Sequence, residues 1–311
     1  MKALAVDLGG SHATCALVQD KSILASRTVQ ASRTTNLKSL LPHLSNTLQT
    51  VRAETNADDL AGVVFGFCGL VDCLQGRILS TNAKFDDGPS LDLVSWCREE
   101  LSLSLRVEND ARLALLGEWY AGAAQGCNDL VMVTLGTGIG GAAMSEGRLL
   151  RGKHFQAGCL GGHLPVDFEG RTCSCGAIGC AEAEASSVSL SEVCRQHPDF
   201  LSSTLASETV ITFEKLFQEL ATGDRVAVEV ADRCLRVWAA NIVSLIHAYD
   251  PELVLVGGGV MKSAGKILPF LQAYVHQHAW TPWGKVRVAG AALGNQAALL
   301  GAIPLLTNLA N

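Results

Sequence analysis

A short polar segment of the chain contains one histidine and three cysteines at a spacing that suits a metal site. The histidine is His163, and the cysteines are Cys173, Cys175 and Cys180. One imidazole and three thiolates form a closed tetrahedral Zn²⁺ site, which leaves no open position for a substrate water. Cysteines can instead be ordinary buried apolar residues, but the glycine, serine and arginine residues nearby make this segment too polar for a core strand. We therefore expect a structural zinc that supports a loop, with the function carried by its neighbours.

The composition of the 311-residue chain excludes several classes of protein. The net charge is −6 at pH 7 and basic residues do not cluster, so we expect no nucleic-acid partner. No apolar run approaches the roughly 20 residues that span a bilayer, and the N-terminal residues lack the long apolar stretch of a signal peptide. Eleven scattered cysteines, an odd number, favour a reducing compartment. We therefore expect a cytoplasmic protein with no membrane partner.

Strands and helices alternate along the chain in the order of an α/β protein. In the first half we expect strands at 4–8, 14–18, 23–28, 62–66 and 105–108, and helices at 37–55, 91–101 and 111–124. In the second half we expect strands at 130–134, 141–145, 253–256 and 286–288, and helices at 185–194, 212–221, 225–249 and 296–306. Each half begins with a strand, a glycine turn and a second strand, which suggests two copies of one unit around a shared cleft.

Three glycine-rich turns, at 7–11, 134–141 and 257–259, directly follow predicted strands. Glycine has no Cβ, so backbone N–H groups in such turns can approach a phosphate closely, and nearby hydroxyl groups add donors. One such turn can serve chain geometry alone, but three together favour a bound nucleotide. The residues that we expect at the nucleotide are Asp7, Gly9, Gly10, Ser11, Thr134, Gly136, Thr137, Gly138, Gly257, Gly258 and Gly259.

A dinucleotide-binding fold is the alternative interpretation of the central turn. That fold needs a Gly-x-Gly-x-x-Gly segment that leads directly into a helix, with an acidic residue about 20 residues later. Here the glycines at 136–141 lead into a predicted strand instead. This order argues against a dinucleotide.

Two aspartates at the ends of predicted strands could serve phosphoryl transfer. Asp110 follows Asn109 at the carboxyl end of a strand, where ligands bind in α/β sheets. Its carboxylate could accept the proton of a substrate hydroxyl, or it could simply cap the helix that begins at Ala111. Asp7 could hold Mg²⁺ near the phosphates, directly or through water, or it could be an ordinary turn residue. The residues alone leave both questions open.

The chain resembles the ROK sugar kinases, a family within the actin-like ATPase superfamily. The resemblance covers essentially the whole chain and rests on segments 7–14, 108–111, 134–141, 151–154, 163–182 and 253–259. It implies an α/β fold of two actin-like (ribonuclease H-like) domains with a cleft between them and a zinc-braced loop. The small domain would comprise 1–116 plus 296–311, closed by the C-terminal helix. The large domain, 117–295, would carry the zinc loop and the nucleotide site.

The resemblance also implies an activity, namely phosphorylation of a hexose or N-acetylhexosamine by ATP and Mg²⁺, usually on the 6-hydroxyl. Asp110 is then the catalytic base, and His163 binds zinc through one ring nitrogen while the other faces the sugar. The residues implied on the sugar side are Gly69, Asn82, Asn109, Asp110, His163 and Glu182. A homodimer is usual for the family.

One segment departs from the family pattern. The family usually has Glu-x-Gly-His before the zinc loop, with a glutamate that hydrogen-bonds hydroxyls near the anomeric end of the sugar. Residues 157–163 read Ala-Gly-Cys-Leu-Gly-Gly-His, which puts Cys159 or Leu160 in place of that glutamate. Losing an ionised hydrogen-bond partner costs about 1.5–3 kcal/mol. Either the preferred sugar differs at C1 or C2, or another side chain replaces the glutamate, or binding is weak.

Two alternatives to an active kinase follow from the same resemblance. The family includes sugar-responsive transcription factors, which carry a DNA-binding segment ahead of the first glycine turn. Here that turn begins at Asp7, so we do not expect direct DNA binding. The second alternative is a catalytically idle sugar sensor, because the missing glutamate could mark lost activity. Retention of Asn109, Asp110 and the three glycine turns favours a working kinase.

Overall fold

The computed structural model describes residues 1–9, 12–31, 36–55, 59–81, 84–307 and 309. Contacts within the chain divide it into two compact units. Unit 1 consists of Met1–Asn128, Ala142–Cys159 and Ala292–Asn311, and unit 2 of Asp129–Gly141 and Leu160–Ala291. We expected the ranges 1–116 plus 296–311 and 117–295, whereas unit 1 also includes 117–128, 142–159 and 292–295. No helix in these described ranges is long and apolar enough to cross a bilayer.

Unit 1 contains a five-stranded mixed sheet with the order β3-β2-β1-β4-β7. Its strands are β1 (Lys2–Leu8), β2 (His12–Gln19), β3 (Ser22–Gln30), β4 (Val63–Phe67) and β7 (Leu105–Asn109). β1 to β3 form an antiparallel meander, and β4 lies parallel to both β1 and β7. β1 and β4 are buried almost throughout, as expected of strands covered on both faces. The carboxyl ends of β1, β4 and β7 therefore meet at one edge of the sheet.

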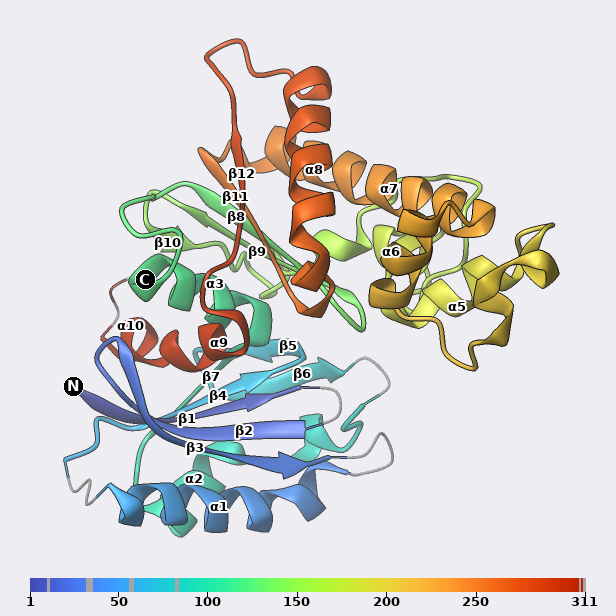
Figure 1. Cartoon of the computed structure of the whole chain (residues 1–311). Coiled ribbons are helices and arrows are strands. Elements are labelled where there is room, and N and C mark those ends of the chain that lie inside the picture. Colours follow the sequence, from blue (N-terminus) through green and yellow to red (C-terminus); the bar gives the residue numbers. More distant parts are fainter. Residues whose placement is uncertain (10–11, 32–35, 56–58, 82–83, 308, 310–311) are drawn as a thin grey trace. The chain divides into compact units, whose positions relative to one another are not determined.

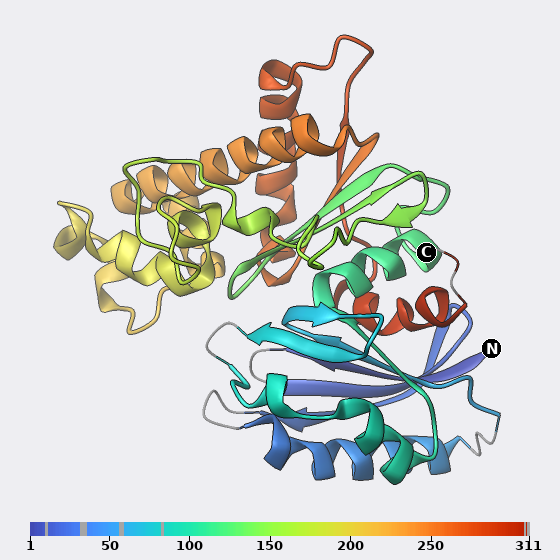
Figure 2. The same ribbon diagram turned by 180° about the vertical axis from the view of Figure 1, so that it is seen from behind.

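Helices cover both faces of this sheet. They are α1 (Leu37–Glu54), α2 (Leu93–Leu101), α3 (Asp110–Ala121), α9 (Ala297–Leu300) and α10 (Ala302–Leu306). Figures 1 and 2 show α1 and α2 on one face and α3, α9 and α10 on the other. The apolar face of α1 is buried as its periodicity predicted.

Two details of unit 1 differ from the expected elements. The hairpin of β5 (Gly69–Asp72) and β6 (Arg77–Thr81) was not predicted, because these strands are short and only partly buried. The expected closing helix at 296–306 is interrupted at Gly301. A Cβ at Gly301 would lie 2.2 Å from the carbonyl oxygen of Leu113, so close packing on α3 requires glycine at this position.

A second five-stranded sheet has the order β10-β9-β8-β11-β12. Its strands are β8 (Leu130–Leu135), β9 (Ile139–Ser145), β10 (Arg148–Leu149), β11 (Leu253–Gly257) and β12 (Arg287–Gly290). β11 lies between β8 and β12 and is parallel to both. All of β11 is buried. The predicted strand, glycine turn and strand at 130–145 are confirmed as β8 and β9.

The helices of unit 2 are α4 (Ala181–Ala185), α5 (Ser187–Arg195), α6 (Phe213–Thr222), α7 (Arg225–Tyr249) and α8 (Ala264–His278). α7 spans the predicted range, because Asp224 caps its first turn through Ala227 N–H and Asp250 ends it in a left-handed conformation. The helix predicted at 185–194 corresponds to α5, whereas the short helix α4 that precedes it was not predicted. The predicted fold class, α/β with mixed sheets in two units, is confirmed.

Candidate functional site

The carboxyl end of β7 places Asn109 and Asp110 at the start of α3. Asn109 caps this helix, because its Oδ1 accepts a hydrogen bond of 3.1 Å from Arg112 N–H. Its Nδ2 donates to the carbonyl oxygen of Gly69 at 3.2 Å and to Oδ1 of Asp110 at 3.1 Å. Asp110 is thus the first helical residue, and Oδ1 also accepts from Ala111 N–H at 2.8 Å. Three of the predicted sugar-side residues, Gly69, Asn109 and Asp110, are therefore directly connected.

Asp110 lies near a second carboxylate, Asp7, at the end of β1. Burial raises the pKa of Asp110 to about 7, and the charge of Asp7 acts in the same direction, whereas backbone N–H groups and Lys84 lower it. Burial likewise raises the pKa of Asp7 to about 6, against a lowering by His12. Two desolvated carboxylates near each other favour uptake of a proton or a cation.

The first glycine turn lies only partly within the described residues. Gly9 N–H donates to the carbonyl oxygen of His12 at 3.1 Å, which closes the turn between β1 and β2. The predicted nucleotide contacts Gly10 and Ser11 and the predicted sugar contact Asn82 lie outside the described residues.

A buried group of charges beside Asn109 was not predicted from the sequence. We call Glu108, Arg112 and Arg151 the Glu108 cluster. Glu108 and Arg112 have no exposed surface, and their side chains approach to 3.4 Å. The second carboxylate oxygen of Glu108 accepts a hydrogen bond of 2.9 Å from Nε of Arg151. Glu108 lies on strand β7 and Arg112 on helix α3, so their spacing of four residues was not the signal of a pair on one helix face.

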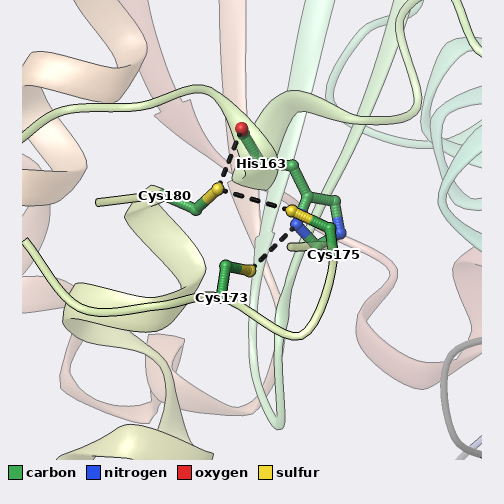
Figure 3. A group of neighbouring side chains, drawn as sticks. All are labelled: His163, Cys173, Cys175 and Cys180. Atoms are coloured by element: carbon green, nitrogen blue, oxygen red, sulfur yellow. Dashed lines mark hydrogen bonds between the residues drawn. The ribbon is translucent and has the colours of Figure 1, made fainter. Parts of the chain in front are cut away.

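The four predicted metal ligands come together in unit 2 (Figure 3). Donor atoms of His163, Cys173, Cys175 and Cys180 all lie within 4.8 Å of one another. Sγ of Cys175 and Sγ of Cys180 are 3.7 Å apart, and Sγ of Cys173 is 3.5 Å from Nδ1 of His163. In a zinc tetrahedron, Zn–S bonds of about 2.3 Å and Zn–N bonds of about 2.0 Å put two sulfurs about 3.8 Å apart and a sulfur and a nitrogen about 3.5 Å apart. The donor set and its spacing therefore fit zinc.

Backbone turns bring these ligands together. Gly176 and Gly179 have φ of +90° and +68°, a conformation that glycine adopts without a Cβ penalty. Gly176 N–H donates to the carbonyl oxygen of Cys173 at 2.9 Å. Beyond Gly179 the chain passes through Cys180 directly into α4, the helix that carries Glu182. The metal ligands therefore fix the position of the first turn of α4.

α4 and α5 connect the zinc loop to the second glycine turn. Oε2 of Glu182 accepts a hydrogen bond of 2.9 Å from Ile139 N–H, the first residue of β9. At the start of α5, the N–H groups of residues 187 and 188 donate to the carbonyl oxygens of Gly136 and Thr137, at 3.0 and 3.2 Å. Glu182 and this turn, predicted as sugar and nucleotide contacts, thus belong to one hydrogen-bonded structure.

The third glycine turn lies beside the second. β11 runs parallel to β8 with Gly257 opposite Thr134, so both turns begin at the same edge of the sheet. A Cβ at Gly258, where φ is +92°, would lie 2.2 Å from the carbonyl oxygen of Leu135. Only glycine permits this approach. Two adjacent turns at strand ends are suited to hold phosphate groups through backbone N–H.

Comparison with known proteins gives matches over nearly the whole chain. A family model described as the ROK family matches residues 3–308. The glucokinase of Thermotoga maritima is 29% identical over 313 residues, which cover 98% of this chain and 97% of that protein. The N-acetylmannosamine kinase of Citrobacter koseri is 30% identical over 308 residues, with 97% of each chain covered.

Solved structures give the same result. The crystal structure of a ROK family glucokinase from Streptomyces griseus, in complex with glucose and AMPPNP, has a TM-score of 0.83 and 27% sequence identity. That comparison covers 99% of this chain and 100% of the other. A ROK hexokinase from Thermus thermophilus has a TM-score of 0.78 at 28% identity, covering 98% of this chain and 97% of the other.

Proposed function

This chain belongs to the ROK family, and on that basis we propose that it is a sugar kinase, which transfers the terminal phosphoryl group of ATP to a hexose or N-acetylhexosamine. The observation that carries the proposal is Asp110, a carboxylate at a strand end with a pKa raised to about 7. Relatives named glucokinase and N-acetylmannosamine kinase, and a glucokinase complex with glucose and AMPPNP, support the same reaction.

In this proposal Asp110 is the general base. Hydrogen bonds from Asn109 and Ala111 orient the carboxylate through Oδ1, and we assign Oδ2 to the sugar hydroxyl, by preference the 6-hydroxyl. Asp110 takes up the hydroxyl proton as the oxygen attacks the terminal phosphorus of ATP. The bond between that phosphorus and the bridging oxygen of ADP then breaks. A base with a pKa near 7 is ionised often enough at neutral pH and matches this task.

The phosphates of ATP are assigned to the glycine turns. The turns at 134–138 and 257–259 supply backbone N–H groups, and Thr134 and Thr137 add hydroxyl donors. Asp7 fits a magnesium ion, because Mg²⁺ prefers carboxylate oxygens and a buried carboxylate gains from a cation. Bound Mg²⁺ neutralises charge on the phosphates.

We assign zinc a structural role in this reaction. With Nδ1 of His163 directed to the sulfur of Cys173, Nε2 is the ring nitrogen that we assign to a sugar hydroxyl. Glu182 follows two residues after Cys180 on α4, so the metal also positions this carboxylate.

The segment before the zinc loop bears on the choice of sugar. Cys159 is 9% exposed and Leu160 is 37% exposed, and neither side chain carries a charge at neutral pH. The Cys159 thiol is directed to the carbonyl oxygens of Phe155 and Gln156, at 3.6 and 3.5 Å. We therefore propose that the preferred sugar does not require a carboxylate contact near C1 or C2.

The experiment that tests the function is a coupled assay of ADP release with a panel of hexoses and N-acetylhexosamines. A kinase gives ADP release that depends on one or a few sugars, and the pattern of active sugars identifies the hydroxyls that matter. ATP binding without ADP release from any sugar would contradict the proposal and favour an idle sugar sensor.

A further inference from the structure

The Glu108 cluster lies beside Asp110 but has no part in the proposed mechanism. Burying charges is costly even when they are paired, and apolar residues of similar size often stabilise a protein as well. The fully buried pair of Glu108 and Arg112 is therefore weak evidence for stability. Its contacts instead indicate a positioning role.

Arg112 binds the segment that leads from β10 toward the zinc loop, residues 151–159. This segment has three residues in the left-handed conformation, Gly152, Phe155 and Gly158. Nη2 of Arg112 donates to the carbonyl oxygens of Phe155, at 3.0 Å, and Ala157, at 2.7 Å. A left-handed residue other than glycine persists only where its surroundings hold it, and at Phe155 the guanidinium does so. Arg151, at the start of the segment, is held by Glu108.

The same cluster holds the end of β7. Oε1 of Glu108 accepts a hydrogen bond of 3.0 Å from Asn109 N–H. The backbone N–H of Arg112 donates to Asn109, which in turn donates to Asp110. Arg112 and Glu108 therefore contact both the 151–159 segment and the residues that orient the proposed base.

The last residue of the segment, Cys159, is one of the two residues, with Leu160, that could stand at the position of the expected glutamate. Its thiol and Nη2 of Arg112 share one acceptor, the carbonyl oxygen of Phe155. Burial raises the pKa of Cys159, and the charges of Arg112 and Asp110 also act on it. The segment thus ends within electrostatic range of both side chains.

We propose that Arg112 is a positioning residue of the sugar kinase reaction, which ties the 151–159 segment to the strand end that carries Asn109 and Asp110. This inference rests on the proposed function. The tie needs a guanidinium, because its planar fork can donate to two carbonyl oxygens and a carboxylate in fixed directions, whereas a lysine ammonium is a single point of charge.

The discriminating variant is Arg112→Lys, which keeps the charge beside Glu108 and loses the fork. We expect kcat/KM for the sugar to fall by about 10–100-fold, mainly through kcat, because a displacement of about 1 Å at the reacting groups has effects of this size. The Kd for ATP should stay unchanged, because the assigned phosphate turns at 134–138 and 257–259 belong to unit 2, and the contacts of Arg112 described above involve neither Asp7 nor Gly9. The matched control is Arg98→Lys at an exposed position of α2, which should change neither kcat/KM for the sugar nor the Kd for ATP.

Hydrogen exchange tests the contacts between Arg112 and the 151–159 segment without any substrate. Amides of the 151–159 segment should exchange at least about tenfold faster in Arg112→Lys than in the wild-type protein, because their local opening no longer breaks the guanidinium contacts. Amides of α1 should be unaffected. If Arg112→Lys does not fold, as judged by circular dichroism, Arg151→Lys provides the same comparison at a side chain that is 17% exposed. Arg151→Lys should lower kcat/KM for the sugar and speed amide exchange of the 151–159 segment, each by a smaller factor than Arg112→Lys.

A folded Arg112→Lys protein with normal sugar kinetics would overturn the positioning role. So would a loss of ATP binding in parallel with sugar turnover, since that pattern indicates a general loss of structure. Absence of turnover in the wild-type protein would contradict the proposed function itself, and the positioning role with it. Hydrogen exchange distinguishes failure of the positioning role from failure of the proposed function, because it reports on the contacts between Arg112 and the 151–159 segment whether or not a sugar is phosphorylated.

Discussion

Asp110 is the residue on which the proposed chemistry depends most. Its surroundings raise its pKa to about 7 through burial and the nearby charge of Asp7, against the lowering effect of backbone N–H groups. The same hydrogen bonds orient the carboxylate at the start of α3. A carboxylate that is held in one orientation and has a pKa close to 7 is suited to proton transfer at neutral pH.

The first prediction concerns the pH dependence of sugar phosphorylation. The base must be ionised, so kcat/KM should fall as the pH decreases through the pKa of Asp110. The midpoint should lie between the ordinary value of 3.8 and about 7, and Mg²⁺ at Asp7 should shift it toward the lower end. A rate profile at saturating ATP measures this midpoint. A rate independent of pH from about 4 to 8 would contradict the assignment.

The second prediction is that Asp110→Asn lowers kcat by about 10²–10⁴-fold and raises the Tm at pH 8. Between about pH 4 and pH 7 the folded protein holds a proton on Asp110 that the unfolded chain releases. The free energy of unfolding therefore decreases as the pH rises through this window, and asparagine removes that loss. Kinetics and thermal unfolding at pH 8 measure both effects.

Asp92→Asn is the control for this variant, because Asp92 is an exposed cap of α2 whose pKa is lowered by hydrogen bonds from Ser95. Ionisation of Asp92 stabilises the fold, so its replacement should lower the Tm at pH 8 and leave kcat unchanged. A near-normal kcat in Asp110→Asn would remove Asp110 from the mechanism.

At the scale of elements, local sequence patterns predicted the features that depend mainly on residues close together in the chain. The apolar periodicity of α1 and the limits of α7 agree with the structure, as do the strands around the glycine turns. The close spacing of Cys173, Cys175 and Cys180 sufficed to predict their cluster with His163. The β5–β6 hairpin and the Glu108 cluster could not be predicted, because each depends on which distant segments the fold brings together.

The third prediction concerns the turn between β11 and α8. Gly258→Ala should lower the free energy of unfolding by roughly 1–3 kcal/mol and weaken ATP binding, because a Cβ there meets the carbonyl oxygen of Leu135 and φ is +92°. Gly265→Ala is the matched control, since this residue lies outside the turns assigned to ATP and its added Cβ would meet no described atom beyond its chain neighbours and its own helix. Denaturant unfolding and nucleotide titration compare the two. Equal effects in both variants would contradict this account of the turn.

The fourth prediction concerns the metal. The purified protein should contain about one zinc per chain, and Cys173→Ser should lose it, because a hydroxyl is a poor zinc ligand. Loss of zinc should raise KM for the sugar, since His163 and Glu182 lose their support. Cys97→Ser, a buried cysteine of unit 1 whose thiol donates to Leu103, should retain the metal. Mass spectrometry measures the zinc content of each variant. A folded Cys173→Ser protein with full zinc content would contradict the proposed ligand set.

At the scale of the whole molecule, the proposed activity uses residues from both compact units. Unit 1 carries the proposed base and unit 2 carries the zinc loop and two of the glycine turns. The family membership was accessible from sequence motifs spread over the chain and is shown by the match over residues 3–308. The homodimer, the Mg²⁺ ion and the identity of the sugar stay predictions, because they depend on molecules other than this chain.

The most direct test of the central claim is ³¹P NMR of the protein with Mg²⁺, ATP and each candidate sugar. The account predicts that the signal of the terminal phosphate of ATP is replaced by a sugar phosphate monoester in equal amount to ADP. Asp110→Asn should form this product at least about 100-fold more slowly while still binding the sugar. Unchanged ATP with every sugar, or conversion of ATP to inorganic phosphate alone, would contradict the account.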